Sequence, residues 1–118
     1  MHTIVHIIRF ESARRLTKVP KGHPCSNLYG LAFKLEIHIE GNVKSNGFVV
    51  DFAEIEEQFK PIKDRIDHAY LNEIEGLENP TSENIVSWIW TKLENKINSL
   101  TKLVLWENEV SRVEYSGN

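Results

Sequence analysis

The sequence predicts an α+β domain in which an antiparallel sheet packs against two helices that lie on one of its faces. Segments of strand composition stand towards both ends of the chain, and two segments with helical periodicity lie between them. The predicted order is therefore β-β-α-α-β-β, with a sheet of about four strands. The chain has 118 residues, which is close to the usual size of one domain. Because no repeat or linker divides it, we expect a single domain over 1–118.

The first half of the chain carries the first strands. Residues 3–10 are mainly β-branched and apolar, which favours a strand. Residues 11–28 contain prolines and glycine and predict a long irregular connection. Residues 30–40 alternate apolar and polar side chains, as expected of a strand with one buried face. Its apolar positions are Phe33, Leu35, Ile37 and Ile39. A glycine-bounded break over 41–47 then predicts a return into a further strand, Phe48–Asp51.

Helical periodicity replaces this alternation in the middle of the chain. Apolar residues recur at steps of three and four, which places them on one face of a helix. They are Phe52, Ile55, Phe59, Ile62 and Ile66. Asp51 suits the N-cap of this helix, and Pro61 is expected to kink or divide it. A second helix is predicted after the N-cap residue Thr81. Its apolar positions are Ile85, Ile89, Leu93, Ile97 and Leu100. Strand composition returns over 102–106 and 110–115.

The composition excludes several classes of partner. The chain carries 14 Lys and Arg against 17 Asp and Glu, a formal charge of −3. Since no predicted face gathers the cations, we expect no nucleic acid partner. No apolar run approaches the roughly 18–20 residues that cross a bilayer, so we expect no membrane partner. The single cysteine excludes an internal disulfide framework, which is typical of a reducing cytosol, and we expect a cytoplasmic protein.

Three places in the sequence could carry chemistry. Cys25 lies in a Pro/Gly loop beside His23; a lone cysteine is more often an inert filler, but this position favours a reactive thiol. Asp67 could orient the imidazole of His68 for proton transfer, or His68 could simply end a helix. Glu107 could accept two parallel N–H bonds from a guanidine-like edge, as in a pterin or guanine, or lie solvated on an edge strand. These residues alone leave the function open.

Several motifs, taken in their order and spacing, resemble one family. They are FESARRL at 10–16, VPKGHPC at 19–25, VVDF at 49–52, LN at 71–72 and GLENPTSE at 76–83, followed by the late Glu107. Together they resemble the 6-pyruvoyltetrahydropterin synthase family, and within it most closely the bacterial 6-carboxytetrahydropterin synthases (6-carboxy-5,6,7,8-tetrahydropterin synthases) of queuosine biosynthesis. The resemblance covers nearly the whole chain.

The resemblance implies both a fold and a set of site residues. The fold is a T-fold, a four-stranded antiparallel sheet backed by two helices, which trimerises into a barrel and often pairs as a hexamer. The family's catalytic cysteine, its Asp-His pair and its pterin-anchoring glutamate correspond to Cys25, Asp67, His68 and Glu107. Members bind 7,8-dihydroneopterin triphosphate between subunits, expel triphosphate and remodel the side chain.

The sequence departs from the family at the metal. The family binds Zn²⁺ through three histidines, and the corresponding positions here are Arg14, Tyr29 and Leu31. Such a zinc site needs about three neutral imidazoles, whereas leucine has no donor, a phenol is a poor ligand and arginine is permanently charged. We therefore predict that the family zinc site is absent and that the protein has no cofactor. Arg14 could instead bind an anionic substituent of the ligand.

The resulting hypothesis is a homo-oligomer, trimer or hexamer, that binds a pterin-like or guanine-like ligand between subunits. Its lyase reaction would be lost, or altered to a zinc-independent form that uses Cys25 with Asp67 and His68. One alternative is a catalytically silent scaffold or ligand sensor. A second alternative is an active 6-carboxytetrahydropterin synthase that recruits its metal through unforeseen ligands.

Overall fold

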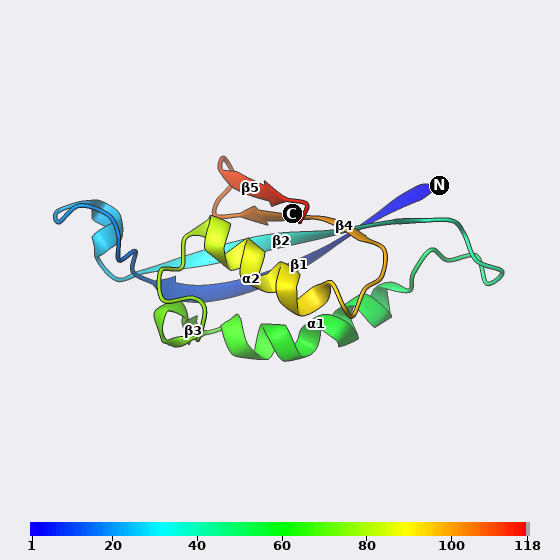
Figure 1. Ribbon diagram of the computed structural model, residues 1–118, viewed down its shortest axis with the longest axis horizontal. Helices are drawn as coiled ribbons and strands as arrows, with labels where there is room; N and C mark the ends of the chain where they lie inside the picture. Colours follow the sequence, from blue (N-terminus) through cyan, green and yellow to red (C-terminus); the bar gives the residue numbers. More distant parts are fainter. Residues whose placement is uncertain (118) are drawn as a thin grey trace.

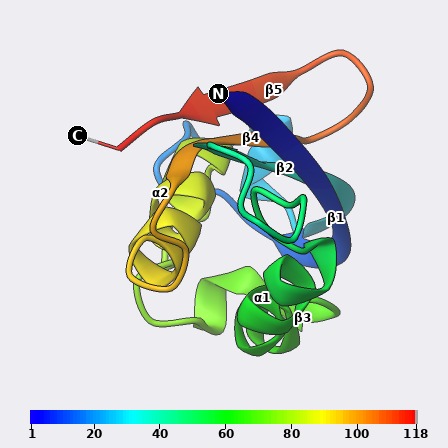
Figure 2. The same ribbon diagram turned by 90° about the vertical axis from the view of Figure 1, so that its right-hand side faces the viewer.

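One sheet with two helices on one of its faces forms the molecule (Figures 1 and 2). The computed structural model describes residues 1–117. The strands are β1 (His2–Arg14), β2 (Tyr29–Gly41), β3 (Ala69–Tyr70), β4 (Leu100–Trp106) and β5 (Arg112–Tyr115), and the helices are α1 (Phe52–Ile66) and α2 (Ser82–Leu93). Two short 3₁₀ turns, η1 (Pro24–Ser26) and η2 (Leu71–Glu73), complete the set. The α+β class and the pair of helices agree with the sequence-based prediction.

The long antiparallel pair of β1 and β2 is the frame of the molecule. Its register runs from His2 opposite Gly41 to Arg14 opposite Tyr29. Alternate side chains of β2 face the helices, as predicted, and its four apolar positions are almost completely buried. β1 continues beyond residue 10 as far as Arg14, so the irregular connection between the two strands is shorter than predicted.

The sheet differs in two respects from the predicted one. It has five strands in the order β3-β1-β2-β4-β5, and β3 runs parallel to β1, so the sheet is mixed rather than antiparallel. The predicted strand at Phe48–Asp51 is wrong. That segment lies in a turn closed on itself, because the amide of Phe48 donates to Asn46 Oδ1 while its carbonyl accepts from the amide of Lys44. Asp51 is the N-cap of α1 rather than part of a strand. Its Oδ1 accepts from the amide of Ala53 at 2.9 Å.

Helix α1 confirms the predicted buried face with one exception and lacks the predicted break. Phe52 is about half exposed, at 51%, and stacks on His6 instead of entering the core. The helix continues through Pro61 without division. A proline at this position removes the bond to the carbonyl of Glu57, and its ring crowds that carbonyl. Both residues are exposed, so water can satisfy that carbonyl.

Helix α2 begins where predicted and ends earlier. Thr81 is its N-cap and accepts from the amide of Asn84 at 3.1 Å. The helix ends at Leu93, so two residues of the predicted apolar series lie beyond it. Ile97 is buried in the connection that follows, and Leu100 opens β4. Within residues 1–117, no helix is both long enough and apolar enough to cross a membrane.

Candidate functional site

Arg14, the last residue of β1, lies at the centre of a buried polar cluster. Its guanidinium donates from Nε to the Tyr29 hydroxyl at 3.0 Å, and from Nη1 to the Pro80 carbonyl at 3.1 Å and Ser82 Oγ at 3.3 Å. Nη2 donates to Glu107 Oε1 at 2.5 Å. Figure 1 shows why these residues meet: β1 and β4 end, and α2 begins, at the same end of the sheet. The side chain of Arg14 is only 3% exposed, so the cluster ties β1, β2, α2 and β4 together.

Tyr29 connects this cluster to the cysteine. Its hydroxyl accepts from Arg14 Nε at 3.0 Å and lies near the Cys25 thiol. Burial, with a further contribution from the thiol, raises the pKa of Tyr29 above its ordinary value of 10.0. The phenol therefore stays protonated at neutral pH. The loop is fixed locally, because the amide of Cys25 donates to His23 Nδ1 at 3.0 Å and its carbonyl accepts from Leu16 at 2.8 Å.

Glu107 follows the last residue of β4 and forms the accessible side of the cluster. Its side chain is 30% exposed, compared with 3% for its partner Arg14. Oε1 is engaged by the guanidinium, whereas Oε2 has no hydrogen-bond partner among residues 1–117. The carboxylate is thus held in a fixed position with one oxygen available to a ligand.

Asp67 and His68 form a second group, beside the β3 edge of the sheet. Asp67 Oδ1 accepts from the amide of Glu11 at 2.9 Å and lies 3.2 Å from His68 Nδ1. The Glu11 amide is the main reason why the pKa of Asp67 is held below its ordinary value, and His68 adds to the effect. His68 has a φ of 56° and a largely exposed ring. Its amide donates to the carbonyl of Glu11 at 2.6 Å, which fixes this left-handed backbone.

The structure therefore brings three of the five predicted site residues together and leaves two apart. Arg14, Cys25 and Glu107 form one cluster around Tyr29, one of the positions that the resemblance assigns to zinc. Among the described residues, no contact joins this cluster to Asp67 or His68. Leu31, the third position assigned to zinc by the resemblance, packs against the edge of the core. Sequence reasoning missed Pro80 and Ser82 as partners of Arg14, although both lie in the GLENPTSE motif; they are 66 and 68 residues from Arg14 in the chain, and no local pattern pairs them with it.

Two adjoining hollows on the open face of the sheet lie next to these groups. One, of about 450 Å³, is lined by Glu107, Trp106 and Lys34 together with Arg9 and Ala32. The other, of about 320 Å³, shares Arg9 and Ala32 and reaches Asp67 and His68.

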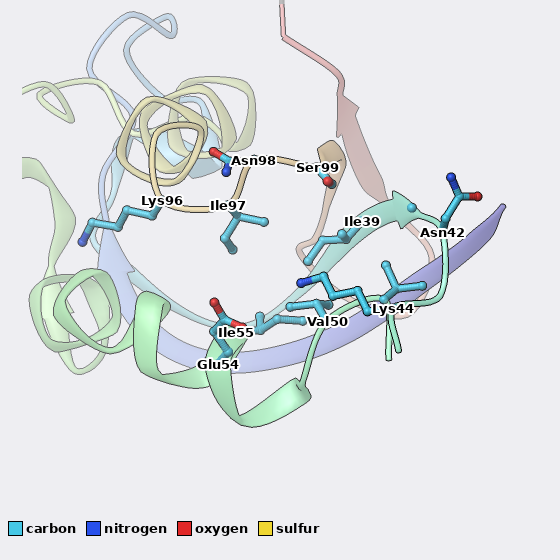
Figure 3. Close-up of a pocket in the computed structure, with 12 residues that line it drawn as sticks. Ile39, Asn42, Lys44, Val50, Glu54, Ile55, Lys96, Ile97, Asn98 and Ser99 are labelled. Atoms are coloured by element: carbon cyan, nitrogen blue, oxygen red, sulfur yellow. The ribbon is translucent and has the colours of Figure 1, made fainter. Parts of the chain in front are cut away.

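A further pocket, shown in Figure 3, lies at the opposite end of β2. It has a volume of about 410 Å³ and is formed by the loop before α1, the start of α1 and the connection from α2 to β4. The Lys44 and Glu54 side chains extend towards the same space in Figure 3. It contains none of the site residues predicted from the sequence.

The residues at the positions that the resemblance assigns to zinc do not fit a zinc ion. The guanidinium of Arg14 brings a permanent positive charge to this place, Tyr29 stays protonated, and Leu31 has no donor atom. Within residues 1–117, no three His, Cys, Asp or Glu side chains are grouped so that they could hold a metal ion.

The fold and the order of the motifs define the class of protein. The chain matches the model of the 6-pyruvoyl tetrahydropterin synthase family over residues 3–118, and it belongs to this family. The predicted resemblance is thereby confirmed. The solved structure of Caenorhabditis elegans 6-pyruvoyl tetrahydropterin synthase superposes with a TM-score of 0.91 at 23% identity, covering 99% of this chain and 96% of the other. This likeness confirms the T-fold.

Two curated relatives stand closer in sequence. The chain is 37% identical over 76 residues to 6-carboxy-5,6,7,8-tetrahydropterin synthase from Synechocystis, covering 59% of each chain. It is 36% identical over 90 residues to dihydroneopterin monophosphate aldolase from Pyrococcus furiosus, covering 74% of this chain and 76% of the relative.

Proposed function

We propose that the protein is a 6-carboxytetrahydropterin synthase-like member of its family, a single T-fold domain over 1–118 that acts in the cytoplasm. It binds a pterin-like or guanine-like ligand at a subunit interface without zinc, and the usual lyase reaction on 7,8-dihydroneopterin triphosphate is lost or altered. The observation that carries the proposal is Glu107, a partly exposed carboxylate fixed by a buried arginine beside the only cysteine.

Glu107 is the anchor of the heterocycle in this proposal. A carboxylate accepts N–H donors of a pterin or guanine through charge-assisted hydrogen bonds, which are stronger than those between neutral groups. The hollow beside it is lined by Ala32 and by the Trp106 ring, which two cationic side chains also contact. Arg14 contributes positive charge next to the ligand, and one of its Nη2 hydrogens is not used within the cluster.

The proposed chemistry uses the Cys25 thiol and the Asp67–His68 pair, which lie apart within one chain. Cys25 would act as general acid or base, with the protonated hydroxyl of Tyr29 near its sulfur. Asp67 would orient His68 for proton transfer. A second copy of the chain would have to supply one of these groups to complete the site. The strand edges support such an assembly, because β1 is paired on its outer side only at Ser12 and Ala13, which leaves most of its outer edge open.

A second candidate function follows from the relative in Pyrococcus furiosus. That relative is named dihydroneopterin monophosphate aldolase. By analogy, the present protein would cleave the side chain of a phosphorylated dihydroneopterin. The silent scaffold and the synthase with unforeseen metal ligands remain the further alternatives.

Binding and turnover measurements test the proposal. Calorimetry with neopterin and guanine should show binding by the parent protein. Glu107→Gln should weaken it by about 2–5 kcal/mol, because the ligand's donors lose a charged acceptor in a desolvated site. Glu94→Gln, at the exposed end of α2 and outside both hollows, is the matched control and should bind as the parent does. Equal binding of every heterocycle by Glu107→Gln and the parent refutes the pterin site.

Incubation with 7,8-dihydroneopterin triphosphate and monophosphate, followed by mass spectrometry, separates the candidate activities. Binding without any product supports the scaffold. Cleavage of the monophosphate that Cys25→Ala abolishes supports the aldolase. Formation of 6-carboxytetrahydropterin that a chelator abolishes supports a synthase with unforeseen metal ligands and overturns the zinc-independent proposal.

A further inference from the structure

We propose that Arg14 determines the ligand specificity of this site, because its charge is paired with Oε1 of Glu107 and makes that oxygen a weaker acceptor for a ligand than Oε2, which has no donor within residues 1–117. The site would therefore hold a heterocycle without requiring the 2-amino group that distinguishes pterin and guanine from their 2-oxo counterparts. This inference rests on the proposed function and specifies which ligands that function accepts.

The contact between Arg14 and Glu107 is chemically the same as the contact that a 2-amino heterocycle would make. A guanidinium is a planar fork of N–H donors, and so is the edge formed by the ring N–H and the 2-amino group of a pterin. A free carboxylate would accept both donors of that edge in parallel. In this chain Nη2 of Arg14 already lies 2.5 Å from Oε1, so a ligand donor at this oxygen has to share it with a guanidinium that offsets its charge, whereas Oε2 has no internal donor within residues 1–117.

Arg14 is not easily displaced from this position. Its contacts with Tyr29, Pro80, Ser82 and Glu107 use four of the five N–H groups of the guanidinium. The guanidinium also lies over the rings of Tyr29 and Phe33, with centroid distances of 5.3 and 5.5 Å. A ligand that competes for Oε1 would leave a buried Nη2 without its acceptor, which is unfavourable. The contact between Arg14 and Oε1 of Glu107 is therefore favoured over a contact between a ligand and the same oxygen.

The consequence concerns the ratio of two affinities. Pterin and lumazine differ in one group, since lumazine carries a carbonyl oxygen where pterin carries the 2-amino group. A carboxylate with both oxygens free gains a hydrogen bond from pterin and repels the carbonyl oxygen of lumazine. A carboxylate shared with Arg14 gains little from the amino group. We therefore expect the parent protein to bind pterin and lumazine with dissociation constants within about threefold of each other, less than one charge-assisted hydrogen bond contributes.

Fluorescence titration with pterin and lumazine tests this expectation on the parent and on two variants. Arg14→Met removes the charge and the donors at similar volume, and Arg14→Gln removes the charge but keeps an amide donor. Both should raise the preference for pterin over lumazine by about tenfold or more, as expected when one charged acceptor is released. Arg15→Gln loses the same charge at the neighbouring exposed position and should leave the ratio unchanged. Thermal unfolding establishes that each variant is folded.

Variants that combine substitutions at Arg14 and Glu107 show whether Arg14 changes the affinity ratio through Glu107. In a Glu107→Gln background, Arg14→Met should no longer change the ratio, because the carboxylate charge that Arg14 offsets is absent. A tenfold or greater preference of the parent for pterin overturns the inference and leaves the proposed function standing, and this result needs no variant. An unchanged ratio in folded Arg14→Met and Arg14→Gln overturns it as well. Failure of the parent and all variants to bind either compound refutes the proposed function and this inference with it.

Discussion

Replacing Arg14 by methionine should destabilise the fold, although Arg14 lies at a site rather than in the apolar core. The change keeps much of the side-chain volume and removes all four hydrogen bonds that join β1 to β2, α2 and β4. It leaves the hydroxyl of Ser82, which is almost completely buried, and the carbonyl of Pro80 without this donor. Glu107 loses the guanidinium that forms its ion pair.

The magnitude follows from the partners of the guanidinium. Three of the four bonds go to neutral groups, and at about 1 kcal/mol each they account for roughly 3 kcal/mol. The ion pair adds about 1 kcal/mol at most, because Glu107 is 30% exposed and solvent screens it. Apolar packing of the methionine offsets part of the loss. We expect a net loss of about 3 kcal/mol in the free energy of unfolding, which leaves a typical domain of 5–15 kcal/mol folded.

Thermal and urea unfolding measure this loss directly. For a domain of this size, about 3 kcal/mol corresponds to a decrease in Tm of roughly 10 °C. Arg15→Met is the matched control, since the Arg15 side chain is exposed and the residue is held only through its backbone and Asn72. A Tm of Arg14→Met within about 2 °C of the parent would mean that the cluster does not hold these elements together, and the argument for a fixed Arg14 would fail.

Three further predictions concern the metal, the assembly and the response to acid. The purified protein should carry no stoichiometric zinc, because the three family ligand positions offer no imidazole; elemental analysis that finds close to one chelator-removable zinc per chain contradicts this. Light scattering at micromolar concentration should give a trimer or a hexamer, because the outer edges of β1 and β5 are open, and a monomer mass would be the opposite result. The amide of Glu11 holds the pKa of Asp67 below its ordinary 3.8 in the folded state. The stabilisation from its carboxylate is therefore complete above that value and is lost as the pH falls through the lower folded-state pKa. Urea unfolding should accordingly show Asp67→Asn less stable than the parent at about pH 7, with a gap that narrows below about pH 4; an equal gap at both would count against the hydrogen bond.

Elements with strong local periodicity could be predicted from the sequence, and elements that depend on distant partners could not. The alternation in β2 and the helical spacing from Ile55 to Ile66 each describe one buried face, and both are present in the structure. β3 has only two residues and exists because it pairs with Ser12 and Ala13. No local pattern marks so short a strand. The segment Phe48–Asp51 has the composition of a strand. Its backbone instead forms hydrogen bonds within a turn and at the N-cap of α1.

In the candidate site, too, residues within local motifs could be predicted, whereas a contact between distant residues could not. Cys25, Glu107 and the Asp67-His68 pair were identifiable because motifs surround them. The pairing of Arg14 with Glu107 was not identifiable, because 93 residues separate the two in the chain and only the finished sheet brings them together. Sequence reasoning treated Arg14 as a free cation for an anionic group, and the structure gives it four partners inside the protein.

The position of β2 in the centre of the sheet has a consequence for the order in which the chain folds. β2 pairs with β1 through a nearby connection, but its other partner, β4, follows both helices in the sequence. A chain emerging from the ribosome can therefore form the β1–β2 hairpin early, whereas its apolar face stays uncovered until α1 and α2 have been made. Closure of the sheet by β4 is a late, non-local event of the kind that slows folding. Because Glu107 follows β4 directly, the proposed ligand site requires that strand to have joined the sheet, and a chain truncated before β4 lacks the glutamate of that site.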